Sequence, residues 1–524
     1  MFLNVKKTDI YILLGGALLL LPIIFFPITT DLAIFIQGGK SIAMGGMPYV
    51  DFIDIKPPAI YYIYSLIYSL FGSSEITLRF LDFIIQFATI VLLYFLTKNN
   101  STSTKFSAYA VIIYALSYTS LAHNQTMQIE SWVPLLSLSI IYFALIADKR
   151  FVHYLFIGIL AGIITALKFS MFFIIFILPL ADYLSGKYSY KIIFNRFLKT
   201  ILGFVFVILL ALLPFAVPEI RSGFTNVSTY LSAYIQYPPI NEVFLRESLK
   251  AIGFFFGDKY SLLLTLMLFV GIFFALRDNQ AHIGGNGKRL FEISFTLLIL
   301  LSISVIAEKK FFPYHFSRLY VVFSLFAAFG LLHFIRGLRE IIKRNKRHWL
   351  SVVLIAFFLL IMSPLPRWFA VLSPTVNYFA ATDKYNAYYN RIGAVLLPQQ
   401  IETAEYIKHN SKPNDKTLVV SVASSIVNYY LGDYAYNKYL LSCFYISQTH
   451  IELWRNDAYN FLRKSKYIVL QDNDMNFVAN GHYLTSERYF MEDELYGKYF
   501  NNHFELVKTI GDFYIYKRID RLKE

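Results

Sequence analysis

The sequence predicts a polytopic α-helical membrane protein with about eleven transmembrane helices, followed by a C-terminal exported α/β domain. Its composition is the first reason: 56% of the 524 residues are hydrophobic and only 16% are charged, whereas a soluble chain of this length carries more charge. Apolar runs of spanning length recur over residues 1–364, and residues 365–524 instead mix helical and strand patterns.

The predicted spans follow one another with short connections. A helix needs about 20 apolar residues to cross a bilayer, and runs near that length lie at residues 10–29, 76–97, 106–122, 132–147, 152–167, 169–185, 200–217, 260–276, 290–307, 314–334 and 349–364. No small-residue cleavage site follows the first run, so we expect an uncleaved anchor rather than a signal peptide.

Cations mark alternate loops between these runs, and this gives the topology. They include Lys6, Lys7, Lys98, Lys105, Lys187, Lys191, Arg196, Lys199, Arg277, Lys288, Arg289, Arg336, Arg339, Lys343 and Arg344. The positive-inside rule then places the N-terminus in the cytoplasm and the C-terminal domain in the periplasm or outside the cell. The net charge of +14 follows from these loops, so we predict no nucleic-acid partner.

The first outer loop, residues 31–72, is predicted to hold interfacial helices. In "GGMPYVDFIDIKPPAIYYIYSLIYSLFG", two glycines and Pro48 signal a turn. The pair Pro57–Pro58 suits a first helical turn, and Gly72 ends the apolar, tyrosine-rich run that follows. We expect this helix to lie at headgroup level, which would hold Lys56 at the depth of lipid phosphates.

The C-terminal domain is predicted over residues 365–524. "QQIETAEYIKHNS" and "SSIVNYYLG" have helical patterns, and "KTLVVSVA", "KYIVLQD" and "FELVKTIGDFYIYKRI" have strand patterns. The region contains no nucleophile motif, glycine-rich phosphate loop or cluster with metal-ligand spacing. The single cysteine, Cys443, excludes an internal disulfide.

Charged and polar residues near the predicted outer boundary are the candidates for chemistry, because a charge there is costly unless it is hydrated, paired or functional. We expect them to converge on one face, where a lipid-linked phosphate would be received. The candidates are Asp31, Tyr49, Asp51, Asp54, Lys56, His123, Glu130, Lys168, His315 and Arg318.

This layout resembles the C-type (GT-C) glycosyltransferase superfamily, in particular its protein mannosyltransferase-like and lipid A aminoarabinose transferase-like branch. The matched elements are Asp31 after the first span, "GG-x-PY-x-DF-x-D-x-KPP-x-IYY" at 45–62, Glu130, Lys168 in "ALKFSMFFIIFILPL" and "FFPYHFSRLY". Two positions depart from the family pattern: Leu32 stands where many members have a second acid, and Tyr314–His315 replaces a His-Tyr order.

The resemblance implies a polyprenyl-phosphate sugar donor, an acceptor on the outer face and inversion at the anomeric carbon. A polyprenyl phosphate leaving group needs cations for its developing charge, and we predict Lys56, Lys168 and Arg318 for this role. A hydroxyl acceptor needs a carboxylate base, and we predict Asp31, then Glu130. With a phosphate acceptor, Asp31 would orient the acceptor instead. Tyr49, Asp51, Asp54, His123 and His315 are predicted to support the site.

Each candidate also has a structural interpretation. Asp31 could be the first hydrated residue after a span, Lys56 a snorkelling anchor, and Glu130 an acid that complements a helix dipole. His315 could belong to an interfacial aromatic belt, and Arg79 and Asp82 could form a pair one helical turn apart. Metal dependence stays open, because no tight His/Asp/Glu cluster occurs along the sequence although converging loops could build one for a divalent ion.

The sequence therefore predicts a multi-pass inner-membrane glycosyltransferase. Its partners would be a polyprenyl-phosphate-linked sugar, membrane lipids and an envelope glycan, lipid or protein acceptor. The first alternative is a transporter or flippase of lipid-linked sugars, which would be expected to carry ionisable groups at mid-membrane depth. The second is a non-catalytic scaffold for envelope assembly.

Overall fold

The computed structural model describes residues 5–519 except 102, 147–149, 237–241, 258–260, 278–285, 310, 345–348, 381–393, 395, 437 and 475–483. The chain forms two compact units. The first, here the helical unit, comprises residues 1–26, 75–212 and 245–380; the second, here the mixed unit, comprises residues 27–74, 213–244 and 381–524. The predicted domain boundary at 364/365 marks the end of the last predicted transmembrane span, and it stays a prediction.

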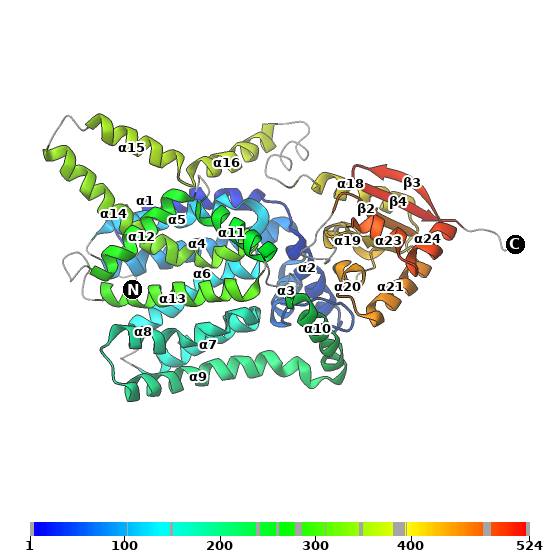
Figure 1. The fold of residues 1–524 in the computed structure, drawn as a ribbon, viewed down its shortest axis with the longest axis horizontal. Helices are drawn as coiled ribbons and strands as arrows, with labels where there is room; N and C mark the ends of the chain where they lie inside the picture. The colour runs from blue at the N-terminus through cyan, green and yellow to red at the C-terminus, as the bar shows by residue number, and fades with distance from the viewer. Residues whose placement is uncertain are drawn as a thin grey trace. The chain divides into compact units, whose positions relative to one another are not determined.

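The helical unit is built of helices and contains most residues of every predicted apolar run, while residues 27–29 and 213–217 of two runs belong to the mixed unit (Figure 1). Its elements are α1 (Lys7–Leu20), η1 (Leu21–Phe25), α4 (Glu75–Asn99), α5 (Thr104–Ser120), η2 (Ala122–Gln125), α6 (Ile129–Ile146), α7 (Phe151–Leu167), η4 (Phe169–Phe176), α8 (Ile177–Ser185), α9 (Tyr190–Leu212), α11 (Glu242–Gly257, from residue 245), α12 (Leu262–Arg277), α13 (Gly287–Glu308), η6 (Pro313–Leu319), α14 (Tyr320–Arg344), α15 (Trp349–Ile361) and α16 (Leu365–Ala380).

Length and hydropathy identify the membrane-crossing candidates among the described residues. Six helices are long and apolar enough, and α15 with the start of α16 passes as a pair bent by 50°. Four shorter apolar helices lie at Ala59–Phe71, Phe151–Leu167, Phe169–Ser185 and Leu262–Arg277. The predicted class, a polytopic helical membrane protein, is therefore confirmed, and the number of about eleven spans stays a prediction.

Glycines let two helix pairs of this unit cross closely. Gly271 of α12 and Gly330 of α14 face each other, because a Cβ on Gly330 would lie 2.0 Å from the Met267 carbonyl oxygen and one on Gly271 would lie 1.9 Å from that of Phe326. Gly158 of α7 packs in the same way against the backbone of α9. In lipid, helices associate mainly through van der Waals packing, and small residues at a crossing allow the two backbones to approach closely.

Gly330→Ala is expected to destabilise the protein by about 1–3 kcal/mol, because its methyl group would force α12 and α14 apart. Thermal unfolding of the purified protein in detergent measures this loss. Gly337→Ala is the matched control: it lies on the same helix, with no atom within 4 Å of its added Cβ. Equal unfolding midpoints for the two variants would contradict the role assigned to the crossing.

The mixed unit joins parts of the chain that are distant in sequence. Its elements are α2 (Thr30–Ala43), α3 (Ala59–Phe71), η5 (Leu213–Ala216), α10 (Pro218–Gln236), α18 (Leu397–Asn410), β1 (Thr417–Val420), α19 (Ser424–Leu431), η8 (Gly432–Tyr434), α20 (Cys443–Ile446), α21 (Glu452–Lys464), β2 (Tyr467–Gln471), α23 (Ser486–Glu492), α24 (Tyr496–His503), β3 (Phe504–Ile510) and β4 (Phe513–Arg518).

A four-stranded sheet in the order β1-β2-β4-β3 organises the C-terminal part of this unit (Figure 1). Strands β1 and β2 are parallel, with Leu418 opposite Ile468, and β4 pairs antiparallel with both β2 and β3. Gly432 ends α19 with a φ of 63°, and Gly511 turns the β3–β4 hairpin with a φ of 53°. The predicted C-terminal α/β fold is confirmed.

One hydrophobic core serves three chain segments of the mixed unit. Tyr49 and Ile53 from the first segment and Val227 and Tyr230 from α10 pack in the same cluster as strand residues such as Ile468. Each of these side chains is at most 3% exposed. The segment around residue 50 is thus built into the core of the α/β domain.

Candidate active site

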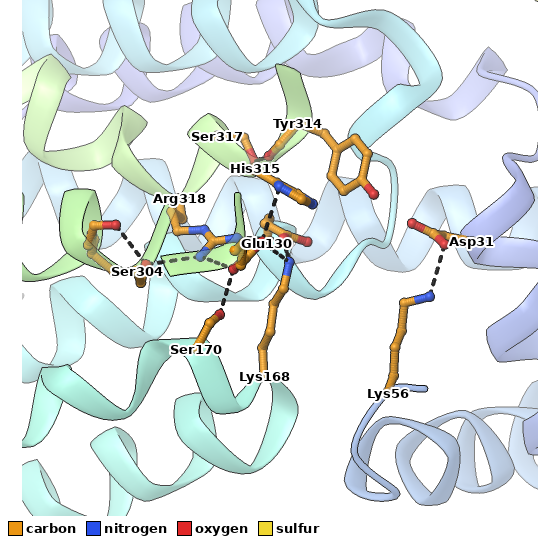
Figure 2. A network of polar contacts seen from close by, with 12 residues as sticks. Asp31, Lys56, Glu130, Lys168, Ser170, Ser304, Tyr314, His315, Ser317 and Arg318 are labelled. Carbon is orange, nitrogen blue, oxygen red and sulfur yellow. Dashed lines mark hydrogen bonds and ion pairs between the residues drawn. The ribbon is translucent and has the colours of Figure 1, made fainter. Parts of the chain in front are cut away.

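Asp31 and Lys56 form an ion pair in the mixed unit, with 3.0 Å between Lys56 Nζ and Asp31 Oδ1 (Figure 2). Their side chains are 18% and 21% exposed, so both remain accessible to a ligand. Asp54 Oδ2 lies 3.5 Å from the same ammonium and is fully buried. Residues 27–74, the first segment of the mixed unit, therefore bring together three of the residues that the sequence predicts for the site.

The start of α2 positions Asp31. Thr29 is the N-cap, and its hydroxyl oxygen accepts a hydrogen bond from the Leu32 amide at 3.2 Å. Asp31 lies in the first turn of the helix, where the helix dipole favours a negative charge. The local sequence "TTD" thus fixes the beginning of the helix and places a carboxylate in its first turn.

Two devices hold Lys56. The predicted proline-led helix is confirmed: Pro58 is the N-cap of α3, and Gly72 follows its end with a φ of 75°. In addition, the Tyr49 hydroxyl donates to the Lys56 carbonyl at 2.7 Å. Burial, with a smaller contribution from the Asp54 charge, raises the pKa of Tyr49 well above its usual range, so Tyr49 stays a donor. Its predicted supporting position thus has a physical basis.

Tyr49 itself adopts a costly backbone conformation. Its φ is 66°, in the left-handed region that side chains other than glycine rarely adopt. Its ring packs on Phe215 and Phe224, and Gly223 lies so close that a Cβ would be 2.3 Å from the Tyr49 carbonyl oxygen. Such strain persists only where the surroundings enforce it, which indicates that the position of this ring is important.

Asp54 and Asp51 have different surroundings. Asp54 is buried against the Tyr61 hydroxyl, which donates to Oδ2, while Oδ1 has no hydrogen-bond partner within the described part of the chain. Asp51 is exposed and accepts a hydrogen bond from the Met47 amide at 2.7 Å, so it closes the turn before the site. Tyr61 was not predicted, although it belongs to the "KPP-x-IYY" motif.

A second cluster lies within the helical unit, around Glu130 (Figure 2). Lys168 Nζ bonds Glu130 and lies 2.8 Å from Glu308 Oε2. Arg318 binds the same two carboxylates, at 2.8 Å from Glu130 Oε1 and 2.7 Å from Glu308 Oε1. His315 Nδ1 lies 3.0 Å from Glu308 Oε2. Four predicted residues, Glu130, Lys168, His315 and Arg318, thus converge here from three separate parts of the chain.

Local helix geometry explains this convergence. Arg318 and His315 lie on the 3₁₀ helix η6, in which residues i and i+3 share a face because each turn has three residues. Glu130 begins α6, and Lys168 links α7 to η4 in an extended conformation. Lys309, with a φ of 57°, ends α13 directly after Glu308.

Burial differs strongly among these residues. Arg318 and Glu130 are 0% and 2% exposed, whereas Lys168 is 20% exposed. A guanidinium buried to this degree is tolerated because two carboxylates and the Ser304 hydroxyl accept its hydrogen bonds. Lys168 is therefore the accessible cation of the cluster, and Arg318 is its structural centre.

Glu308 was missed as a site residue, although it is one of few acids near an apolar run. Its Oε1 also accepts a hydrogen bond from the Ser170 hydroxyl at 2.5 Å.

The predicted supporting residue His123 lies on η2, where burial first and then the charge of Arg79 lower its pKa to about 4, so it is neutral at pH 7. The suggested Arg79–Asp82 pair is wrong: Arg79 pairs with Glu75, and Asp82 accepts from Tyr118.

Glu130, Glu308 and His315 also form the group that the sequence left open for a divalent ion, with ligand atoms within 4.8 Å of one another. Carboxylate and imidazole ligands suit Zn²⁺ or Mn²⁺. However, Lys168 and Arg318 already neutralise both carboxylates, so a divalent ion would leave excess positive charge in a buried place. With Lys168 in this position, the residues do not fit a resident ion.

Lys168→Ala is expected to create a divalent metal site, because it removes the ammonium that lies between the two carboxylates. Isothermal titration of the purified variant with Zn²⁺ or Mn²⁺ should show about one bound ion per chain. Lys168→Arg keeps the positive charge and should bind no ion. Binding of equal affinity to the wild-type protein would show that Lys168 does not exclude the metal.

Comparison with known proteins agrees with this architecture. Residues 55–218 match the family model described as dolichyl-phosphate-mannose-protein mannosyltransferase. No curated protein sequence matches the chain. The crystal structure of ArnT from Cupriavidus metallidurans bound to undecaprenyl phosphate is similar with a TM-score of 0.55 at 12% identity, covering 99% of each chain.

The apo state of ArnT from Cupriavidus metallidurans is also similar, with a TM-score of 0.52 at 13% identity, covering 98% of this chain and 99% of that one. At this low identity the likeness is one of fold, and it extends over nearly the whole of both proteins. Together with the match to residues 55–218, it confirms the resemblance to GT-C glycosyltransferases predicted from the sequence, and this chain shares its fold with ArnT.

Proposed function

We propose that this protein is a glycosyltransferase of the inner membrane that transfers a sugar from a polyprenyl phosphate to a cell-envelope acceptor on the outer face. The observation that carries the proposal is the partly exposed Asp31–Lys56 pair, with 3.0 Å between the carboxylate and the ammonium. A base and a phosphate-binding cation are the two groups that this reaction requires. The matched family is named for a dolichyl-phosphate sugar, and one similar structure contains undecaprenyl phosphate.

The reaction would proceed by inversion in a single displacement. The acceptor hydroxyl oxygen attacks the anomeric carbon while the bond from that carbon to the phosphate oxygen breaks, and the bonding electrons leave with the polyprenyl phosphate. Asp31 accepts the hydroxyl proton, which makes the oxygen a competent nucleophile. Lys56 stabilises the negative charge that grows on the phosphate. With a phosphate acceptor, Asp31 would orient the acceptor without accepting a proton.

Three further roles stay predictions. We predict that Glu130 is a second carboxylate and that Lys168 and Arg318 bind phosphate. All three residues lie in the cluster of the helical unit. The exposure of Lys168 favours it over the enclosed Arg318 for ligand contact. For Arg318 we propose a positioning role, since its nitrogens already bind two carboxylates and a hydroxyl.

The orientation in the membrane is also part of the proposal. The cation-rich loops favour a cytoplasmic N-terminus and a periplasmic or extracellular C-terminal domain. A reporter enzyme fused to the C-terminus of the full chain, active only outside the cytoplasm, tests this. Reporter activity is expected, and its absence would contradict the proposed topology.

The transfer itself is tested with the full chain in lipid nanodiscs. The donors are undecaprenyl-phosphate-linked sugars, and an envelope lipid and glycan extract provides acceptors. Mass spectrometry should detect free undecaprenyl phosphate together with an acceptor that has gained the mass of one sugar. A parallel assay in sealed proteoliposomes tests the alternative: if the lipid-linked sugar crosses the bilayer there without being cleaved, the protein is a transporter instead.

A further inference from the structure

The C-terminal α/β domain contacts the residue next to Asp31. The Ser425 hydroxyl donates to the Thr30 carbonyl at 2.9 Å. In return, the Gln37 side chain on the next turns of α2 donates to the Ser425 carbonyl at 2.8 Å. Ser425 is fully buried and Gln37 is 8% exposed, so water competes little for these bonds. One residue of the domain thus binds α2 at two points that flank Asp31.

The same domain contacts the chain just before Lys56. The Ile53 amide donates to the Lys438 carbonyl at 2.7 Å, and Ile53 pairs with Tyr439 in a parallel bridge. Beyond Lys56, the Tyr429 hydroxyl donates to the Ser73 carbonyl at 2.9 Å, directly after α3. The backbone segments that carry Asp31 and Lys56 are therefore both hydrogen-bonded to the α/β domain, in addition to the ion pair between the two side chains.

The contact around Ser425 belongs to a rigid part of the domain. Ser425 lies in the first turn of α19, shortly after the parallel strand β1. The preceding Ser424 hydroxyl accepts from the Ser442 amide at 3.2 Å, and the Ser442 hydroxyl in turn accepts from the Ser421 amide at 3.1 Å. Groups held in this way on regular elements can fix reacting residues to within fractions of an ångström.

We propose that the C-terminal domain positions the catalytic pair. Ser425 is the positioning residue for Asp31, and the Lys438 carbonyl holds the segment that leads to Lys56. This inference rests on the proposed function and adds a role for the domain. A displacement of about 1 Å costs a reaction of this kind about 10²-fold, and the remaining bonds from the domain would keep the displacement below this when one anchor is lost. Loss of one anchor should therefore slow transfer without abolishing it.

Ser425→Ala in the full chain is the test. Turnover is expected to fall about tenfold, which corresponds to about 1.4 kcal/mol, while the KM for the donor changes little. Hydrogen exchange of the amides in residues 30–37, followed by mass spectrometry in nanodiscs, should become faster. Ser425→Thr keeps the hydroxyl and should restore both the exchange protection and the turnover.

Ser465→Ala is the matched control, because it removes another buried hydroxyl of the same domain, which donates to the Phe461 carbonyl at 2.7 Å. It should change neither readout. Unchanged exchange in Ser425→Ala, or faster exchange with unchanged turnover, would overturn the positioning role. If wild-type protein transfers no sugar, the proposed function fails, and the exchange data still show separately whether the domain holds α2.

Discussion

Asp31→Asn is expected to lower the turnover number for sugar transfer by about 10²–10⁴-fold, the usual contribution of a general base. The amide keeps the size of the carboxylate but cannot accept the proton of the acceptor hydroxyl. It also removes the negative charge that pairs with Lys56 at 3.0 Å. Release of undecaprenyl phosphate, measured against time by mass spectrometry, gives the turnover number of each variant.

Asp415→Asn is the control for this substitution. Asp415 is a partly exposed acid of the same unit and accepts a hydrogen bond from the Lys412 amide within a turn, so its loss should leave turnover unchanged. Full activity of Asp31→Asn with a hydroxyl acceptor would refute the assignment of the base. Continued translocation of the lipid-linked sugar by Asp31→Asn, with no transfer in any variant, would favour a transporter.

Arg318→Met should be the most damaging substitution for stability, at a cost of about 3–5 kcal/mol. The side chain is fully enclosed, and it binds Glu130 and Glu308 at 2.8 and 2.7 Å. Its removal leaves two buried carboxylates to share Lys168. The loss is measured as a lower midpoint of thermal unfolding of the purified protein in detergent.

Lys343→Met supplies the comparison, because Lys343 pairs with Glu340 at 2.6 Å while both side chains are more than half exposed. Such pairs contribute at most about 1 kcal/mol. Combining Arg318→Met with Glu308→Gln should recover part of the lost stability, since one unbalanced charge disappears. Equal midpoints for Arg318→Met and Lys343→Met would mean that the buried network contributes nothing.

Local signals in the sequence were sufficient to predict most of the fold. Among the described residues, every predicted apolar run is helical over most of its length, because runs near 20 residues leave few alternatives in a membrane. Turn residues were equally informative: Pro58 begins α3, Gly72 ends it, and Gly432 ends α19. The division into compact units could not be foreseen, since it depends on contacts between segments that are hundreds of residues apart.

The candidate site was predictable in residue type but not in pairing. The rarity of charge at a membrane boundary and the family resemblance together indicate Asp31 and Lys56, and the structure places the two side chains in contact. Glu308 was passed over, because nothing in the sequence shows that Lys309 turns the chain so that Glu308 meets Arg318. Likewise, the bond from Tyr49 to the Lys56 carbonyl depends on a strained backbone that no residue pattern announces.

The core that residues 27–74 share with the C-terminal domain has a consequence for biosynthesis. The bond from Ser425 to Thr30 joins positions 395 residues apart, so ribosomes finish most of the polypeptide before this bond can form. Residues 27–74 therefore cannot complete their packing until the C-terminal strands have been synthesised. Nascent or prematurely terminated chains would therefore lack the backbone contacts that hold the segments on either side of the Asp31–Lys56 pair.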